Sequence, residues 1–156
     1  MIDRYTRPRM SAIWDLQHKY EIWLEVELQA CAAFERGGQI PRGTSARIRK
    51  KAKIDVARIA EIEKVTKHDV IAFLESLMDS VGPEHRFLHM GLTSSDIVDT
   101  SLAVQMTEAL DIILEGLDGL IDVLKRQAMR HKMTVMVGRS HGIHGHRLIS
   151  LLQFRC

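Results

Sequence analysis

The sequence predicts an all-α fold. Apolar residues recur at intervals of three and four over most of its length, which is the spacing of one helix face. No segment alternates apolar and polar residues as a half-buried strand would. The three prolines, Pro8, Pro41 and Pro83, lie outside the long periodic stretches. Because aromatic residues make up only 5%, we expect an aliphatic, Met-rich core.

End signals place the individual helices. Ser11 is the candidate N-cap of the first helix, which Gly37 and Gly38 end ahead of Pro41. Residues 1–10 are expected to be an extended polar arm, and residues 84–92 a connector. The later helices are expected over Thr44–Lys53, over Asp55–Val65, from Asp69 to Gly82, and from Thr93 or Ser94 to about His131.

The last of these helices is the longest, and it carries an apolar stripe with the seam spacing of a helical bundle. The stripe consists of Leu102, Met106, Leu110, Ile113, Leu117, Leu120 and Leu124. The upstream helices are too short to cover it, so either the chain oligomerises through the stripe or the rest of the bundle is missing. We therefore expect an N-terminal helical domain over 1–92, the start of a central helical bundle over 93–137, and a histidine-rich loop and tail over 138–156.

Composition and charge narrow the function classes. Hydrophobic residues at 46% and charged residues at 27% are typical of a soluble globular protein. The one basic cluster (Arg47, Arg49, Lys50, Lys51 and Lys53) favours a solvated helix face over a nucleic-acid patch, because no interleaved aromatic residues accompany it. Two isolated cysteines, no apolar leader and no run of 18 apolar residues favour a cytoplasmic protein without a membrane span.

Two predicted helix starts gather polar residues. Lys67-His68-Asp69 precedes one apolar helix, where free backbone N–H groups and the helix dipole favour anions. An ordinary helix start capped by Asp69 is the alternative. The run from His89 to Asp96 has three hydroxyls after a glycine turn, more than one cap requires, and they could donate to a carboxylate.

The segment from Ser140 to His146 holds the densest group of histidines, at positions 141, 144 and 146. Neighbouring glycines let a ligand approach, and histidine titrates near neutral pH, so proton transfer is one interpretation. Metal binding is a second, although no carboxylate or thiolate lies near. A plain flexible loop is the third.

Four segments, in order along residues 1–144, resemble the adenylosuccinate lyase family. They are Arg4 to Trp14, Thr66 to Val70, His89 to Thr100, and Gly138 to His144. The last two have looser counterparts across the fumarase/aspartase superfamily, whereas Arg4-Tyr5 and Lys67-His68-Asp69 are typical of the adenylosuccinate branch. The resemblance implies the N-terminal helical domain of that superfamily followed by the first long helix of its bundle.

The resemblance also implies an activity. The family cleaves adenylosuccinate to AMP and fumarate by β-elimination, and cleaves the succinylated carboxamide intermediate of purine biosynthesis in the same way. It uses no cofactor or metal and works as a homotetramer. By resemblance, His141 is the general acid and His68 supports it. The implied substrate-binding residues are Arg4, Tyr5 and His89 for the nucleotide and its phosphate, Thr93 and Ser94 for a succinyl carboxylate, and Lys67 and Asp69 along the same site.

The sequence departs from the family after His144. The family continues with an Ala-Glu-Pro-Thr-Thr-like run, whereas here Gly145-His146-Arg147 follows and the chain ends at Cys156. We expect a truncation or a frameshift at this point. The loop with the serine thought to be the family's base is absent, so we expect a chain that is inactive alone. A non-catalytic helical interaction module is the alternative function.

Overall fold

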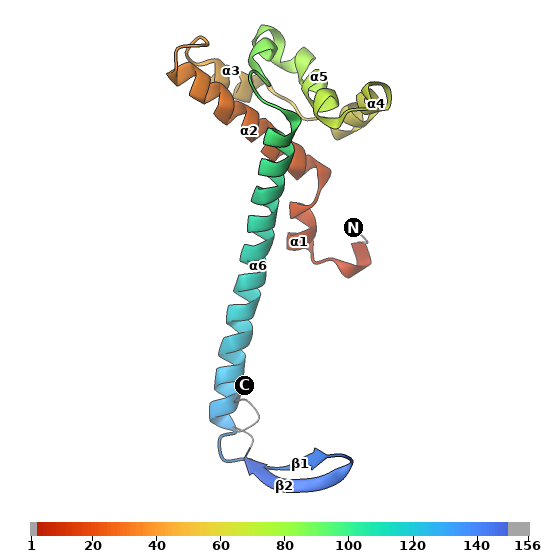
Figure 1. Cartoon of the computed structure of the whole chain (residues 1–156), viewed down its shortest axis with the longest axis vertical. Coiled ribbons are helices and arrows are strands. Elements are labelled where there is room, and N and C mark those ends of the chain that lie inside the picture. Colours follow the sequence, from red (N-terminus) through yellow and green to blue (C-terminus); the bar gives the residue numbers. More distant parts are fainter. Residues whose placement is uncertain (1–2, 150–156) are drawn as a thin grey trace. The chain divides into compact units, whose positions relative to one another are not determined.

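Helices form most of the regular structure in residues 3–149, the part of the chain that this computed structural model describes (Figure 1). The all-α prediction is confirmed, with one β-hairpin added. The elements are the 3₁₀ helix η1 (Asp3–Tyr5), α1 (Pro8–Ile13), α2 (Leu16–Arg36), α3 (Thr44–Lys51), α4 (Val56–Thr66), α5 (Asp69–Val81), the 3₁₀ helix η2 (Gly82–Phe87), α6 (Ser94–Arg130), β1 (Val135–Ser140) and β2 (Ile143–Ile149). Within the described residues, no helix combines the length and apolarity needed to cross a membrane.

The chain divides into two compact units, Met1–Leu110 and Asp111–Cys156, and the division falls inside α6. The domain boundaries expected from the sequence, after residues 92 and 137, stay predictions.

The N-terminal arm differs from its prediction. It was expected to be extended up to a helix start at Ser11, but η1 and α1 lie there, and Ser11 is inside α1. Pro8 occupies the first turn of α1, where its fixed φ suits a helix and its missing N–H costs nothing. The chain then breaks at Trp14 and Asp15, and Asp15 has the extended backbone of an N-cap for α2.

The core of the first unit is aromatic at its centre. Trp23 and Phe73 are fully buried, with ring centroids 5.5 Å apart in an edge-to-face arrangement. Tyr20 stacks on Phe73 at 5.8 Å. Aliphatic side chains surround them, and the buried core within the described residues includes no methionine. The expectation of a Met-rich core was therefore wrong, because a few large rings at the centre bury more apolar area than their number suggests.

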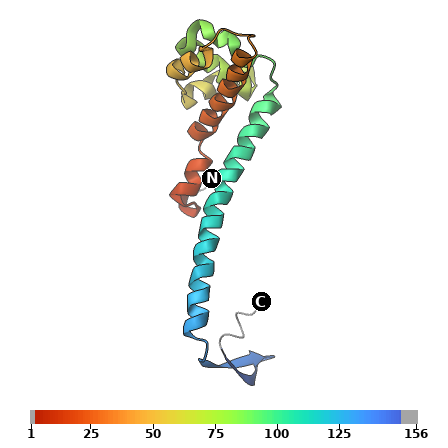
Figure 2. The ribbon, with the colours of Figure 1, turned by 90° about the vertical axis from the view of Figure 1, so that its left-hand side faces the viewer.

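The first turns of α6 pack within this unit, and Figure 2 shows α1 and α2 alongside them. Trp23 Nε1 donates a hydrogen bond of 2.8 Å to the Ser101 hydroxyl. Gln105 Nε2 donates at 2.6 Å to the carbonyl oxygen of Ile13. On this face of α6 the buried residues are Ile97, Ser101, Gln105 and Ala109. These polar bonds link the N-terminal helices to α6 across about 80 to 90 residues of sequence.

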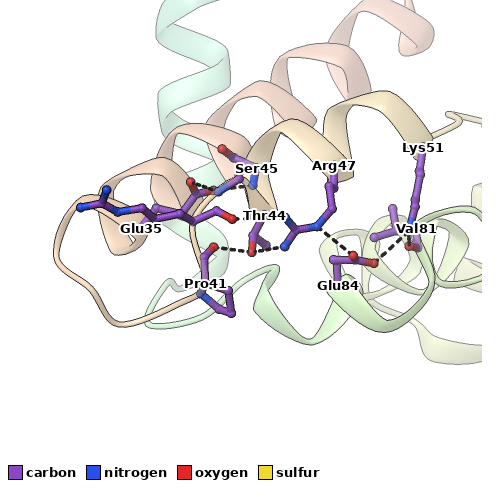
Figure 3. Close-up of polar contacts among 10 residues, drawn as sticks. Glu35, Pro41, Thr44, Ser45, Arg47, Lys51, Val81 and Glu84 are labelled. Atoms are coloured by element: carbon purple, nitrogen blue, oxygen red, sulfur yellow. Dashed lines mark hydrogen bonds and ion pairs between the residues drawn. The ribbon is translucent and has the colours of Figure 1, made fainter.

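The basic cluster is a solvated, ion-paired surface, as the sequence favoured (Figure 3). Arg47 Nε and Lys51 Nζ lie 3.1 and 3.0 Å from the two carboxylate oxygens of Glu84. The hydrogen bond from Lys51 is the main cause that lowers the pKa of Glu84. Glu35 accepts from the backbone N–H groups of Gly43 and Ser45 at the start of α3, which lowers the pKa of Glu35. Two acids therefore anchor α3: Glu84 of η2 through Arg47 and Lys51, and Glu35 of α2 through the backbone at the start of α3.

The second unit consists of the rest of α6 and the β-hairpin. No residue of α6 beyond Leu110 is buried. Strands β1 and β2 pair antiparallel, with Val135 opposite Ile149 and Ser140 opposite Ile143, and the register shifts between Val137 and Arg139. The run after Val137 was expected to be a loop. It forms a hairpin instead, because His141 and Gly142 both adopt positive φ, as a tight type I′ turn requires.

Candidate functional site

Two of the predicted polar segments meet at the N-terminal ends of α5 and α6. His68 Nε2 lies 3.4 Å from the Ser94 hydroxyl, although 26 residues separate them in sequence. His68 is also the N-cap of α5, because its Nδ1 accepts from the Ile71 backbone N–H at 3.5 Å. Asp69 was the predicted cap. It is instead the first helical residue, and its carboxylate accepts from the Val70 N–H at 2.8 Å.

This geometry selects one tautomer of the neutral His68 ring. Since Nδ1 accepts a hydrogen bond, the proton is on Nε2, which then donates to the Ser94 oxygen. Ser94 is left with its own O–H to donate elsewhere. The pair therefore offers a hydroxyl donor at the start of a long helix, where the dipole favours an anion.

Thr93 lies beside this pair and closes a capping box. Its backbone N–H donates to the Asp96 carboxylate at 2.8 Å, and its hydroxyl oxygen accepts from the Ser95 N–H at 3.4 Å. Side chains thus accept hydrogen bonds from two of the backbone N–H groups at the start of α6, those of Thr93 and Ser95. The Thr93 hydroxyl keeps its proton to donate, so Thr93 and Ser94 each offer a hydroxyl donor at this helix start.

Lys67 and His89 have strained backbones. With His141, they are the non-glycine residues of residues 3–149 that adopt positive φ, at 54°, 58° and 52°. Each of the three was a predicted site residue. Such conformations cost energy and persist where the surroundings enforce them, which happens most often at functional sites. Lys67 also ends α4 and lines a shallow depression of about 440 Å³ with Ala60, Glu63 and Lys64.

Glu27 is a site residue that sequence reasoning missed. Its side chain is 0% exposed, and its two oxygens bind His89 through the backbone N–H at 2.6 Å and through Nδ1 at 2.7 Å. A signal was present in the sequence. Glu27 lies midway between Trp23 and Cys31 on the apolar face of α2, where an acid needs a partner.

Two other predicted residues, Arg4 and Tyr5, belong to η1 at the start of the first unit. The Arg4 guanidinium stacks on the Tyr5 ring at 4.7 Å, and that ring is 73% exposed. His141 belongs to the second unit, where it is exposed at the tip of the hairpin. Within residues 3–149, no three His, Cys, Asp or Glu side chains gather as a metal site.

Comparison with known proteins identifies the family. A model of a family described as "Lyase" matches residues 3–146. The chain belongs to this lyase family. Its sequence is 47% identical to the adenylosuccinate lyase of Bacillus subtilis over 144 residues, which cover 92% of this chain and 33% of that protein. It is 50% identical over the same length to the enzyme of Synechocystis, again covering 92% and 33%. The resemblance to adenylosuccinate lyases of the fumarase/aspartase superfamily is confirmed.

Solved structures agree with this membership. The fumarate lyase of Mesorhizobium sp. BNC1 matches with a TM-score of 0.82 at 25% identity, over 89% of this chain and 34% of its own. The 3-carboxy-cis,cis-muconate lactonizing enzyme of Pseudomonas putida matches with a TM-score of 0.84 at 28% identity, over 95% and 36%. The lyase-family chain therefore spans about a third of the length of the curated relatives that it matches.

Proposed function

We propose that this chain supplies part of an adenylosuccinate lyase site and does not turn over substrate alone. In the proposed reaction, a base takes a proton from the succinyl carbon next to a carboxylate, the C–N bond breaks, and an acid protonates the departing nitrogen. Fumarate and AMP are released. The contact between His68 and Ser94 is the observation that carries this proposal. It brings two family segments together at the N-terminal ends of α5 and α6, where an anion would be favoured.

The residue roles follow the family resemblance. His141 is the proposed general acid, and His68 assists it. The proposed substrate contacts are Arg4, Tyr5 and His89 with the nucleotide and its phosphate, Thr93 and Ser94 with a succinyl carboxylate, and Lys67 and Asp69 along the site. The reaction needs no cofactor. The bundle stripe of α6 (Leu102 to Leu124) would lie between copies of a cytoplasmic homotetramer, and 41% or more of the surface of each of its side chains is exposed in this chain.

The proposed inactivity rests on missing chemistry. The four family segments recognised in this chain do not include the loop with the family's proposed serine base, and His68 and His141, the plausible substitutes, already have proposed roles. A general base is typically worth about a hundred- to ten-thousand-fold in rate. Fumarate release from adenylosuccinate, followed by absorbance, should therefore stay at background for both the wild-type chain and His141→Ala. Robust turnover by the wild type that disappears in the variant would contradict inactivity.

Ligand binding tests the site itself. Ser94→Ala should weaken adenylosuccinate binding about tenfold, the typical worth of a hydrogen bond to a charged group. Ser95→Ala is the matched control, because Ser95 is the exposed neighbour on the same helix turn. Equal affinities of the two variants in a calorimetric titration would contradict a carboxylate site at Ser94.

A second candidate function is a non-catalytic helical interaction module. The exposed α6 stripe favours it, since large apolar patches of this kind usually mark an interaction surface. Absence of any adenylosuccinate binding together with self-association of the chain would support this candidate over the first.

A further inference from the structure

The buried carboxylate of Glu27 forms hydrogen bonds with His89, one of the predicted site histidines. Glu27 lies in the middle of α2, and solvent does not reach it. Burying a carboxylate costs several kcal/mol unless hydrogen bonds compensate it. His89 contacts both oxygens of this carboxylate, one through its backbone N–H and the other through its ring Nδ1. The buried carboxylate of Glu27 thus binds a single residue of the loop before α6, His89.

The bond to Glu27 decides which ring nitrogen of His89 can meet a ligand. An ionised carboxylate only accepts hydrogen bonds, so Nδ1 must carry a proton to make the contact of 2.7 Å. Nε2 is then the nitrogen left for a ligand. The second contact, from the His89 N–H to Glu27, holds the backbone at its φ of 58°. The His89 side chain stays 23% exposed, so its outer edge remains within reach of solvent.

We propose that Glu27 is a positioning residue for His89. It fixes the ring orientation and the Nδ1–H tautomer, so that the Nε2 lone pair is left to accept from a hydroxyl or amino donor of the bound nucleotide. This inference rests on the proposed function for its ligand, but the tautomer follows from the geometry of the free chain. Buried acids often orient histidines in this way, and the oriented ring then presents a single nitrogen to its ligand.

The chain contains a matched control pair. His18 in α2 contacts Glu108 in α6 at the same distance of 2.7 Å, but through Nε2 rather than Nδ1. These two side chains are 32% and 38% exposed, and neither is a predicted site residue. His18 should therefore carry its proton on Nε2. The two histidines are expected to show opposite tautomers in the same sample.

The ¹⁵N NMR spectrum of the histidine rings in the full chain tests this directly, about two pH units above the ordinary imidazole pKa. The wild type should show His89 as Nδ1–H and His18 as Nε2–H, with signals assigned from His89→Gln and His18→Gln. In Glu27→Gln, the amide can donate to Nδ1, so His89 should shift to Nε2–H. Glu108→Gln should alter only His18, and Glu27→Asp should keep His89 as Nδ1–H.

The second readout is the affinity for AMP. Glu27→Gln should weaken it about tenfold, whereas Glu108→Gln should leave it unchanged. A wild-type His89 protonated only on Nε2 would overturn the inference, as would a Glu27→Gln variant with unaltered tautomer and unaltered affinity. If Glu27→Gln fails to fold by circular dichroism, the wild-type tautomer alone decides. Absence of AMP binding in the wild type would overturn the proposed nucleotide site, while the NMR result still decides the role of Glu27.

Discussion

The first unit and the part of α6 from Asp111 to Arg130 use apolar residues at the same helical spacing, with opposite outcomes. In the first unit, Phe73 and Leu77 of α5 are 0% exposed. In α6, Leu117 and Leu120 are 47% and 52% exposed. Helix propensity and periodicity are similar in the two regions. The difference is that α2, α3 and α4 supply partners for α5, whereas the second unit offers α6 no cover within the described residues.

This contrast shows that an apolar stripe in the sequence predicts which face of a helix is apolar, but does not predict whether that face is buried. The core side chains of the first unit gain transfer free energy, at about 25 cal/mol per Å² of apolar surface. The α6 stripe gains this energy only when something else covers it. The predictions below test whether the two regions differ in this way, from the largest expected effect to the smallest.

Phe73→Ala should cause the largest loss of stability. Phe73 packs between Tyr20 and Trp23, so the change removes two ring contacts and leaves a cavity. We expect the free energy of unfolding to fall by about 3–5 kcal/mol. Urea unfolding followed by Trp23 fluorescence, in a Trp14→Phe background, measures it. A loss below about 1 kcal/mol would mean that this site collapses freely and is not a packed core.

Trp23→Phe should have a smaller effect. It keeps most of the buried ring but removes the hydrogen bond of 2.8 Å to Ser101, which joins α2 to α6. Ser101 still donates to the Val98 carbonyl, so its hydroxyl is not orphaned. The expected loss is about 1–2 kcal/mol, measured by chemical denaturation with circular dichroism. In a double-mutant cycle with Ser101→Ala, additive losses would show that the bond contributes nothing.

Glu84→Gln should lower the free energy of unfolding at neutral pH and have no effect at acidic pH, where Glu84 is protonated. Lys51, and more weakly Arg47, lower the pKa of Glu84 from its ordinary value of 4.5. A carboxyl with a lowered folded pKa stabilises the fold above its unfolded pKa and loses this contribution as pH falls through the folded pKa. The wild type should therefore be more stable than the variant at pH 7, and the gap should close on acidification below 4.5. A gap that is constant with pH would contradict the ion pair.

Leu117→Ala should leave the unfolding free energy of the first unit unchanged, within about 0.5 kcal/mol at low protein concentration. The same chemical change at a buried position, Leu77→Ala, should cost about 2–5 kcal/mol. Light scattering at high concentration should show less self-association for Leu117→Ala than for the wild type. Equal costs at the two positions would mean that the stripe is already covered, and would remove the contrast between the regions.

Local signals predicted most helix limits. Asp55 caps α4 through its hydrogen bond with the Arg58 N–H, and Gly82 ends α5 with a φ of 75°. The break at Trp14 and Asp15 escaped prediction, because neither residue is a glycine or proline and the apolar spacing continues across them. The hairpin escaped it as well. Its turn depends on a positive φ at His141, a conformation that is uncommon for residues other than glycine.

The candidate site divides in the same way. The two segments that meet at the ends of α5 and α6 could be recognised from their residues, and the comparisons confirm the family. The contact between His68 and Ser94 could not be predicted, because it joins the ends of two helices 26 residues apart. Glu27 was overlooked for the same reason, since 62 residues separate it from His89.

Helix positions, the stripe of α6 and family membership were thus present in the order of the residues, because helix hydrogen bonds and caps join near neighbours in sequence. The tertiary structure alone decided which apolar face is buried and which acid contacts which histidine. Those outcomes depend on contacts between distant segments, and their energy exists only once α2, α5 and the start of α6 have packed together.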